Sequence, residues 1–344
     1  MGNIFFVLSG EHPTLPCAEL RSVLDAESFT YTILDKMHQV VRLRVDERAL
    51  PVIDARCGLT RAGCLEIALM EPNLERISRT LRRLSFDSVL RKGDRIAARV
   101  IRLGRVSGEK IERLEEEIGT AAVSNIPGLN VDLRKPQVLL IGVLAEDFFI
   151  LGARKGPLPK KGFFERRPRK RPFFHATVMS VKLSRCMVNL ARPRDDDLVL
   201  DPFCGTGSIL LEAGLMGFRV AGGDVKRRMV VGCAENLRHF DLDPALVLHD
   251  ARQTSFMIAD VIVTDPPYGR AATTMGLDSC EVLRAFFQEA SRLLMKGRHI
   301  CLAYPQGSKL KEIGLESGFT LIESHLLYVH SSLTREIAVF AKDN

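Results

Sequence analysis

The chain has 344 residues, of which 46% are hydrophobic, and this length suggests two or three domains with substantial cores. It has no run of 18 or more apolar residues without a charge, which argues against a membrane span, and its beginning lacks the features of a secretory signal. Its eight cysteines include no Cys-x-x-Cys pair, so we expect a cytoplasmic protein without a disulfide framework, a zinc finger or another metal site.

The net charge of +7 comes from the first half of the chain. Residues 1–172 contain 30 Lys and Arg against 22 Asp and Glu, whereas residues 173–344 contain 19 against 20. A basic half beside a nearly neutral half is typical of a polyanion-binding module attached to another domain, although a solubilised surface explains the same numbers. The charge therefore favours a nucleic-acid partner without establishing one.

Short strand-like and helix-like runs alternate through residues 1–152. The first group is predicted to contain a strand at Ile4–Ser9, a helix at Pro16–Leu24 and a strand at Gln39–Val45. The second group is predicted to contain a basic helix near Leu74–Ser85, a strand at Arg95–Ile101, a helix at Lys110–Ile118, and two paired strands at Val138–Leu144 and Phe148–Leu151. The pattern indicates two small α/β units in series, with a boundary near residues 55–70.

The segment Gly152–Pro172 is rich in Pro, Gly, Lys and Arg and has no strand or helix periodicity, which predicts a linker. It carries a basic cluster that either contacts RNA phosphates or forms a solvated surface: Arg166, Arg167, Arg169, Lys170 and Arg171. We favour phosphate contact, because the segment joins two domains that would both lie on one RNA.

From Phe173 onward, apolar runs of about five residues alternate with helical patterns, which is typical of a parallel sheet covered by helices. The predicted strands are Leu198–Asp201, Arg219–Asp224, Leu246–His249, Ala259–Thr264, His299–Tyr304, Thr320–Leu327 and Ile337–Ala341. The predicted helices are Gly207–Met216, Lys226–Phe240, Glu281–Leu294 and Ser308–Ser317. Seven strands with intervening helices predict an α/β, doubly wound fold of Rossmann type.

The first motif, Asp201-Pro-Phe-Cys-Gly-Thr-Gly-Ser208, ends one of these strands and opens a helix. Its glycines allow a tight turn and a close ligand approach, and the helix N-terminus offers N–H groups to a carboxylate. Asp201 could accept an ammonium group or a hydroxyl. The motif fits neither the dinucleotide fingerprint nor the P-loop, and alone it is compatible with an ordinary strand–helix turn.

Two further strands also end in acidic residues. Asp224 lies about 20 residues beyond the glycine turn, where an acidic residue grips ribose hydroxyls, although it could instead cap the following helix. Asp250, in His249-Asp250-Ala251, could accept an adenine amino group. Because ligands of such sheets bind outside the carboxyl ends of the strands, the three acidic ends together predict a nucleoside site.

The motif Thr264-Asp265-Pro-Pro-Tyr-Gly269 is the most specific. Its prolines stiffen the turn and favour an extended Asp265. A nucleobase amine is a poor nucleophile, because its lone pair is delocalised into the ring. The Asp265 carboxylate and the Pro266 carbonyl would accept its N–H groups and aim the lone pair at a methyl group, while Tyr268 stacks on the base. We therefore predict a catalytic set of Asp265, Pro266, Pro267 and Tyr268 that needs no metal.

These motifs carry a family resemblance. The glycine turn and the Asp-Pro-Pro-Tyr motif resemble those of class I amino-methyltransferases. Two stretches, Arg171–Leu190 and His330-Ser-Ser-Leu-Thr-Arg335, resemble the catalytic half of the archaeal tRNA guanine-10 N2-methyltransferase family. Ala176 stands where that family has Pro and Ser331 where it has Lys. Asp132–Leu140 is similar to the end of a THUMP domain, an RNA-binding module.

The resemblance implies S-adenosylmethionine as the cofactor, tRNA as the substrate, and one or two methyl groups transferred to N2 of guanine 10. It implies a ferredoxin-like domain at residues 1–60, a THUMP domain at 61–152, a basic linker at 153–172 and a methyltransferase domain at 173–344. The expected cofactor-binding residues are His175, Asp201, Phe203, Gly205, Thr206, Gly207, Asp224, Asp250, Ala251 and Asp265.

Several other interpretations stay open at this point. One is methylation of guanine at another tRNA position or in ribosomal RNA, and a weaker one is methylation of adenine N6 in DNA, since the Asp265 motif serves both chemistries. A non-catalytic RNA-binding protein would have no need of that motif, and a small-molecule methyltransferase would not need the basic first half. The sequence also leaves open whether a small helper subunit takes part.

Overall fold

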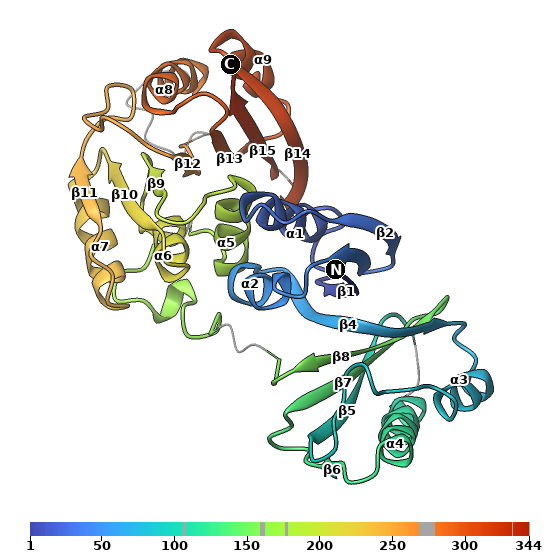
Figure 1. The fold of residues 1–344 in the computed structure, drawn as a ribbon. Helices are drawn as coiled ribbons and strands as arrows, with labels where there is room; N and C mark the ends of the chain where they lie inside the picture. The colour runs from blue at the N-terminus through green and yellow to red at the C-terminus, as the bar shows by residue number, and fades with distance from the viewer. Residues whose placement is uncertain (106–107, 159–161, 176–177, 268–278, 332, 344) are drawn as a thin grey trace. The chain divides into compact units, whose positions relative to one another are not determined.

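The computed structural model describes residues 1–344 except 106–107, 159–161, 176–177, 268–278, 332 and 344. The chain divides into two compact units. The first contains residues 1–11, 29–54 and 60–160, and the second contains residues 12–28, 55–59 and 161–344. Figure 1 shows the helices and strands of both units. None of the described helices is both long enough and apolar enough to cross a membrane.

The first unit is built on an eight-stranded sheet with the strand order β2-β3-β1-β4-β8-β7-β5-β6. The strands are β1 (Gly2–Leu8), β2 (Thr32–Met37), β3 (Val40–Val45), β4 (Thr60–Met70), β5 (Arg95–Arg102), β6 (Asn130–Val131), β7 (Val138–Leu144) and β8 (Phe149–Lys155). Helices α3 (Leu74–Leu81) and α4 (Gly108–Asn125) pack on this sheet through an apolar cluster that includes Ile77, Ile118 and Leu140. Every strand and helix predicted for this part is confirmed, whereas β2, β4, β6 and α2 (Ala49–Arg56) were not predicted.

The long strand β4 joins the two predicted N-terminal domains into one sheet. It pairs with β1 on one side, where Ile4 lies opposite Leu65, and with β8 on the other, where Leu65 lies opposite Ala153. Both pairings are antiparallel. The hydrogen-bonded sheet therefore continues across the predicted boundary near residue 60. The division into a ferredoxin-like and a THUMP domain stays a prediction.

The second unit contains a seven-stranded sheet with the order β11-β10-β9-β12-β13-β15-β14, in which β15 runs antiparallel to its neighbours. The strands are β9 (Leu198–Asp201), β10 (Arg219–Asp224), β11 (Ala245–Leu248), β12 (Val261–Thr264), β13 (His299–Pro305), β14 (Phe319–His330) and β15 (Leu333–Lys342). The helices are α1 (Leu15–Ala26), α5 (Val181–Leu190), α6 (Ser208–Leu215), α7 (Arg227–Arg238), α8 (Ser279–Leu293) and α9 (Leu310–Glu316). The predicted Rossmann-type fold is confirmed.

Alternate residues of the central strands are buried in two separate apolar cores, because successive side chains of a strand point to opposite faces of the sheet. In β12, Val261 and Val263 join a cluster formed with α1, α5 and α6, whereas Ile262 joins a cluster formed with α8 and α9. In β15, Val339 and Phe340 are divided in the same way. The sheet is therefore buried on both faces, which explains why its strands are continuous apolar runs in the sequence.

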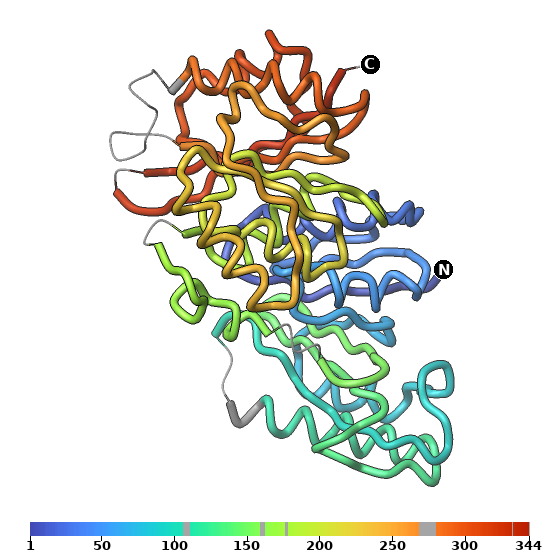
Figure 2. The backbone as a smooth tube through the Cα atoms, turned by 90° about the vertical axis from the view of Figure 1, so that its left-hand side faces the viewer, coloured from blue at the N-terminus to red at the C-terminus, as the bar shows by residue number. Residues whose placement is uncertain are grey.

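Helix α1 belongs to the second unit although it lies near the start of the chain. It packs beside α5, and both views show the blue N-terminal helix next to the yellow-green one (Figure 1, Figure 2). The fully buried carboxylate of Glu19 on α1 accepts hydrogen bonds from the backbone N–H of Gly58 and Leu59, each at 2.7 Å, and from the Asn189 amide at 2.9 Å. Two stretches of the predicted first domain, residues 12–28 and 55–59, thus complete the Rossmann-type unit.

Candidate active site

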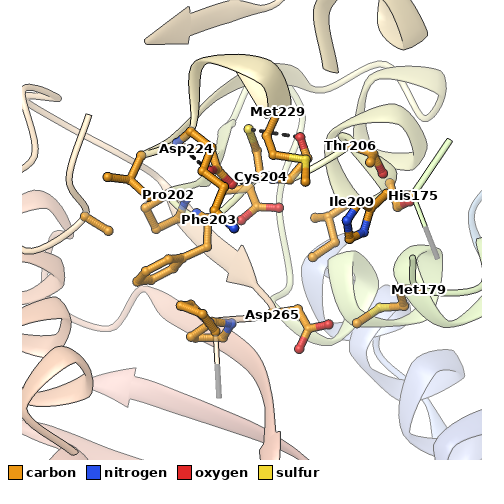
Figure 3. Close-up of a pocket in the computed structure, with 18 of the residues that line it drawn as sticks. His175, Met179, Pro202, Phe203, Cys204, Thr206, Ile209, Asp224, Met229 and Asp265 are labelled. Atoms are coloured by element: carbon orange, nitrogen blue, oxygen red, sulfur yellow. Dashed lines mark hydrogen bonds between the residues drawn. The ribbon is translucent and has the colours of Figure 1, made fainter. Parts of the chain in front are cut away.

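A cavity of about 540 Å³ lies at the carboxyl edge of the seven-stranded sheet. The ends of β9, β10, β11 and β12 all contribute to its lining, as expected where ligands bind to such sheets. The lining includes nine of the ten residues predicted to bind the cofactor, namely His175, Asp201, Phe203, Gly205, Thr206, Asp224, Asp250, Ala251 and Asp265. Figure 3 shows Asp265 and Asp224 on opposite sides of the cavity in that view.

The tenth residue, Gly207, shapes the turn after β9. Gly205 has φ 51° and Gly207 has φ 82°, in the left-handed region where side chains are disfavoured. A Cβ atom on Gly207 would also lie 2.5 Å from Sγ of Cys233 on α7. Gly207 is the N-cap of α6 and is not among the described residues that line the cavity. Its contribution is therefore the backbone path of the turn.

Asp224 connects the turn after β9 to the start of α7. Its Oδ2 accepts a hydrogen bond from the Gly205 N–H at 3.1 Å, and its Oδ1 accepts one from the Lys226 N–H at 2.9 Å. The carboxylate therefore braces the glycine turn, and it also lines the cavity. The alternative role of a helix cap is met only in part, because the N-cap position of α7 is Lys226 and the bond from Gly205 comes from another loop.

Asp201 is almost completely buried at the end of β9, with 2% of its surface exposed. Its Oδ1 accepts hydrogen bonds from the Thr264 hydroxyl at 2.7 Å and from the Phe203 N–H at 3.2 Å. Burial raises the pKa of Asp201 to about 7, although both hydrogen bonds favour the ionised form. Thr264 begins the motif that continues through Asp265, but its bond to Asp201 was not predicted, because that bond crosses from β9 to β12.

Asp250 is paired with Arg252, which also lines the cavity. The Arg252 Nε lies 2.9 Å from both carboxylate oxygens, and the backbone N–H of Arg252 donates to Oδ1 at 3.0 Å. These bonds lower the pKa of Asp250, so the group is a carboxylate at neutral pH. The sequence suggested Asp250 as an acceptor but not its cation, although the two are only two positions apart.

Asp265 follows β12 and has two differently placed oxygens. Oδ2 lies 3.3 Å from Nη1 of Arg335 on β15. Oδ1 is buried and accepts no hydrogen bond from the described residues. Burial raises the pKa of Asp265 to about 6, and the charge of Arg335 opposes that rise. Pro266 and Pro267 line the cavity beside it, and Tyr268 lies outside the described residues.

The basic linker cluster separates into two groups. Arg166 donates to the fully buried Glu212 of α6 at 2.7 and 3.1 Å, and Arg171 is 5% exposed and donates to the Ser208 hydroxyl at 2.6 Å. Burial lowers the pKa of Arg171 to about 10. These two side chains anchor the linker to α6, and phosphate contact stays a prediction for both of them. The other three cations of the cluster are less buried: Arg167, Arg169 and Lys170.

Known proteins resemble the chain along its whole length. The family described as "RMKL-like, methyltransferase domain" matches residues 168–337. The tRNA (guanine(10)-N2)-dimethyltransferase of Methanothermobacter thermautotrophicus is 37% identical over 99% of both chains. The enzyme of the same name from Methanocaldococcus jannaschii is 29% identical over 98% of this chain and 99% of its own.

A solved structure supports the same architecture. TrmN from Thermus thermophilus aligns with a TM-score of 0.57 and 22% identity, covering 99% of both chains. At this identity the likeness concerns the fold, whereas the archaeal relative of 37% identity establishes the family. The chain therefore belongs to the family of the archaeal tRNA (guanine(10)-N2)-dimethyltransferases.

Proposed function

We propose that the protein transfers one or two methyl groups from S-adenosylmethionine to N2 of guanine 10 in tRNA. The observation that carries the proposal is the buried, unpartnered Oδ1 of Asp265 among the described residues, beside a cavity lined by carboxylates from three other strand ends. The target atom follows from the chemistry of this motif, and the position follows from the relatives' name.

The residues around the cavity suit S-adenosylmethionine. A volume of about 540 Å³ lies within the range of sites for ligands of this size. Asp224 would accept the ribose hydroxyls, Asp250 and Ala251 would hold the adenine, and the turn from Gly205 to Gly207 would approach the methionine part. His175, Asp201, Phe203 and Thr206 complete the proposed binding set. When bound, the cofactor supplies a methyl group on a sulfonium, a good leaving group that requires no metal.

Asp265 would orient the target amine. Its Oδ1 and the carbonyl of Pro266 accept the two N–H groups of guanine N2, so the lone pair points away from the base plane and toward the methyl group. A new N–C bond forms as the methyl leaves the sulfonium, and the nitrogen then gives up one proton to the Asp265 carboxylate. One N–H remains after the first transfer, so a second and slower transfer needs room for the first methyl group.

Substrate binding would depend on the basic first half and the linker. The Lys170 ammonium lies 3.8 Å and the Arg167 guanidinium 4.7 Å from the centre of the Phe164 ring, which is itself exposed. We assign phosphate contact to Arg167, Arg169 and Lys170. The ferredoxin-like and THUMP domains of the first 152 residues would hold the tRNA, and the guanine would leave its stack to reach Asp265. A cytoplasmic location is part of this proposal, which leaves open whether a small helper subunit takes part.

The function is tested by locating the methyl group. tRNA transcripts with guanine or adenine at position 10 are incubated with the protein and labelled S-adenosylmethionine, digested, and analysed by mass spectrometry. We expect N2-methylguanosine and N2,N2-dimethylguanosine from position 10 and no label in the adenine transcript. Label on guanine N2 elsewhere would retain the chemistry and correct the position. Label on another atom would overturn the proposal.

A further inference from the structure

We propose that Arg335 is a positioning residue for the methyl transfer, whose guanidinium engages Oδ2 of Asp265 and leaves Oδ1 for the substrate amine. The inference rests on the proposed function, because it concerns the same site. It adds a second element of the fold to the reaction, since Asp265 follows β12 whereas Arg335 lies on β15.

The sheet topology brings these two residues to one edge. β15 is antiparallel to β13, and Arg335 lies opposite Pro305, the last residue of β13. β12 is parallel to β13 on its other side and ends at Thr264. The beginning of the antiparallel strand therefore meets the carboxyl ends of the parallel strands, where the cavity lies. Only an antiparallel strand can present its first residues there.

The contact divides the two oxygens of Asp265 between two tasks. Nη1 of Arg335 lies 3.3 Å from Oδ2, and the two side chains are 16% and 21% exposed. Both residues line the cavity. Oδ1, by contrast, is buried and accepts no hydrogen bond within the described part of the chain. An ion pair on one oxygen limits rotation of the carboxylate, so the other oxygen keeps a constant direction for an incoming N–H group.

Arg335 also favours the ionised form of Asp265. Only a carboxylate offers acceptors on both oxygens, and burial works against that form by raising the pKa to about 6. Arg335 is the cation that lowers this pKa. Other charged or titratable side chains also line the cavity. They come from the segment before α5, from the ends of β9, β10 and β14, and from the loops after β10 and β11: His175, Asp201, Asp224, Lys226, His249, Asp250, Arg252 and His330.

The test compares pH profiles of single-turnover methyl transfer at saturating tRNA and cofactor. In Arg335→Gln the acid limb should move up by about one pH unit, since an opposite charge at this distance typically shifts a carboxyl pKa by roughly 1–3 units. The rate should fall about fivefold near pH 6 and about tenfold below pH 5, and it should recover toward alkaline pH, where the carboxylate forms without help. Arg335→Lys, which retains the charge, should keep the acid limb near its wild-type position.

Arg192 provides a matched control. It forms an ion pair with Glu323 at 2.8 Å in the same unit, with side chains 15% and 19% exposed, and neither residue lines the cavity. Arg192→Gln should leave the pH profile unshifted. Asp265→Asn identifies the limb that belongs to Asp265, because this variant should lack it. Calorimetry with S-adenosylhomocysteine checks that each variant is folded. If Arg335→Gln does not fold, Arg335→Met takes its place as the neutral variant.

Three outcomes would overturn the inference. The rate of the neutral Arg335 variants could fall by the same factor at every pH, or their pH profile could match that of the wild type. The same shift in Arg192→Gln would assign the effect to general destabilisation. The proposed function is judged separately, from the wild-type product: if that protein forms no N2-methylguanosine, the function fails, whereas a normal product with an unshifted Arg335→Gln profile rejects only the role of Arg335.

Discussion

Asp224 is expected to contribute to both binding and local structure. Its carboxylate lines the cavity and accepts hydrogen bonds from Gly205 and Lys226. Loss of a charged acceptor typically costs about 1.5–3 kcal/mol, so Asp224→Ala should weaken cofactor binding roughly ten- to a hundredfold. Calorimetry with S-adenosylhomocysteine measures this, with Asp243→Ala as an acidic control outside the cavity lining. An unchanged dissociation constant would leave Asp224 only its bracing role.

Asp201 makes the stability of the second unit depend on pH. Its pKa is raised to about 7, so the folded protein retains this proton more tightly than the unfolded chain. The carboxyl therefore contributes stability at low pH that is lost as pH rises from about 4 to about 7. Asp201→Asn keeps an acceptor for the Thr264 hydroxyl but does not ionise, so its Tm relative to wild type should rise through that window.

Thermal unfolding of both proteins without cofactor, between about pH 4 and pH 8, measures the difference. The raised pKa of Asp265 also lowers the stability of the folded protein as pH rises. Because Asp265 is present in both proteins, its effect cancels from the comparison. A Tm difference that stays constant with pH would contradict the assignment to Asp201.

At the scale of elements, Glu212 of α6 joins three parts of the second unit. It is fully buried and pairs with Arg166 of the linker at 2.7 Å and with Arg185 of α5 at 2.9 Å. Glu212→Ala would leave both cations without their buried anion, so we expect a loss of about 3–5 kcal/mol in the free energy of unfolding. Glu316→Ala removes the half-exposed partner of Arg284 and should cost about 1 kcal/mol or less. Equal losses in urea unfolding would contradict the buried network.

Some strands and helices could be predicted from the sequence and others could not. β9, β10 and β7 were predicted with their observed bounds, because buried strands are short apolar runs bounded by turn residues. β4 and α5 were not predicted as elements. β4 combines small, charged and apolar residues and is held by its neighbours β1 and β8, and α5 owes its position to α1 and α6. Tertiary pairing decides such segments more than local pattern does.

In the candidate site, too, local motifs were predictable and contacts between distant strands were not. The acidic strand ends were predictable because each stands in a short motif whose chemistry is local. Thr264 and Arg335 also stand in sequence motifs, but their contacts with Asp201 and Asp265 were not predictable, since these contacts depend on strand order. For Arg171 the sequence context was misleading. The basic linker suggested a solvent-facing cation, whereas Arg171 is buried and donates a hydrogen bond to Ser208.

At the scale of the whole molecule, the remaining linker cations should govern salt-dependent tRNA binding. Changing Arg167, Arg169 and Lys170 together to Ala should weaken binding and reduce the slope of log affinity against log salt by about 2–3, roughly one unit for each phosphate that is no longer neutralised. Filter binding over a range of salt concentrations measures this slope. Cofactor affinity should not change. An unaltered slope would show that these cations are solvated and bind no phosphate.

Point substitutions suit this question better than removal of the first half. A chain starting near residue 171 would lack α1 and residues 55–59, which belong to the second unit. It would also lack Glu19, whose carboxylate bonds Asn189 of α5. Poor tRNA binding by such a fragment would then combine the absence of the basic half with damage to the catalytic unit.

Single-turnover methylation by Asp265→Ala tests whether Asp265 orients the guanine amine. With saturating tRNA and cofactor, the rate of N2-methylguanosine formation should fall by about 10²–10⁴-fold, the range expected for a positioned acid–base group. The dissociation constants for tRNA and S-adenosylhomocysteine should change by less than about threefold, because the residue acts on the reacting atom. A near-normal rate in this variant would contradict the account.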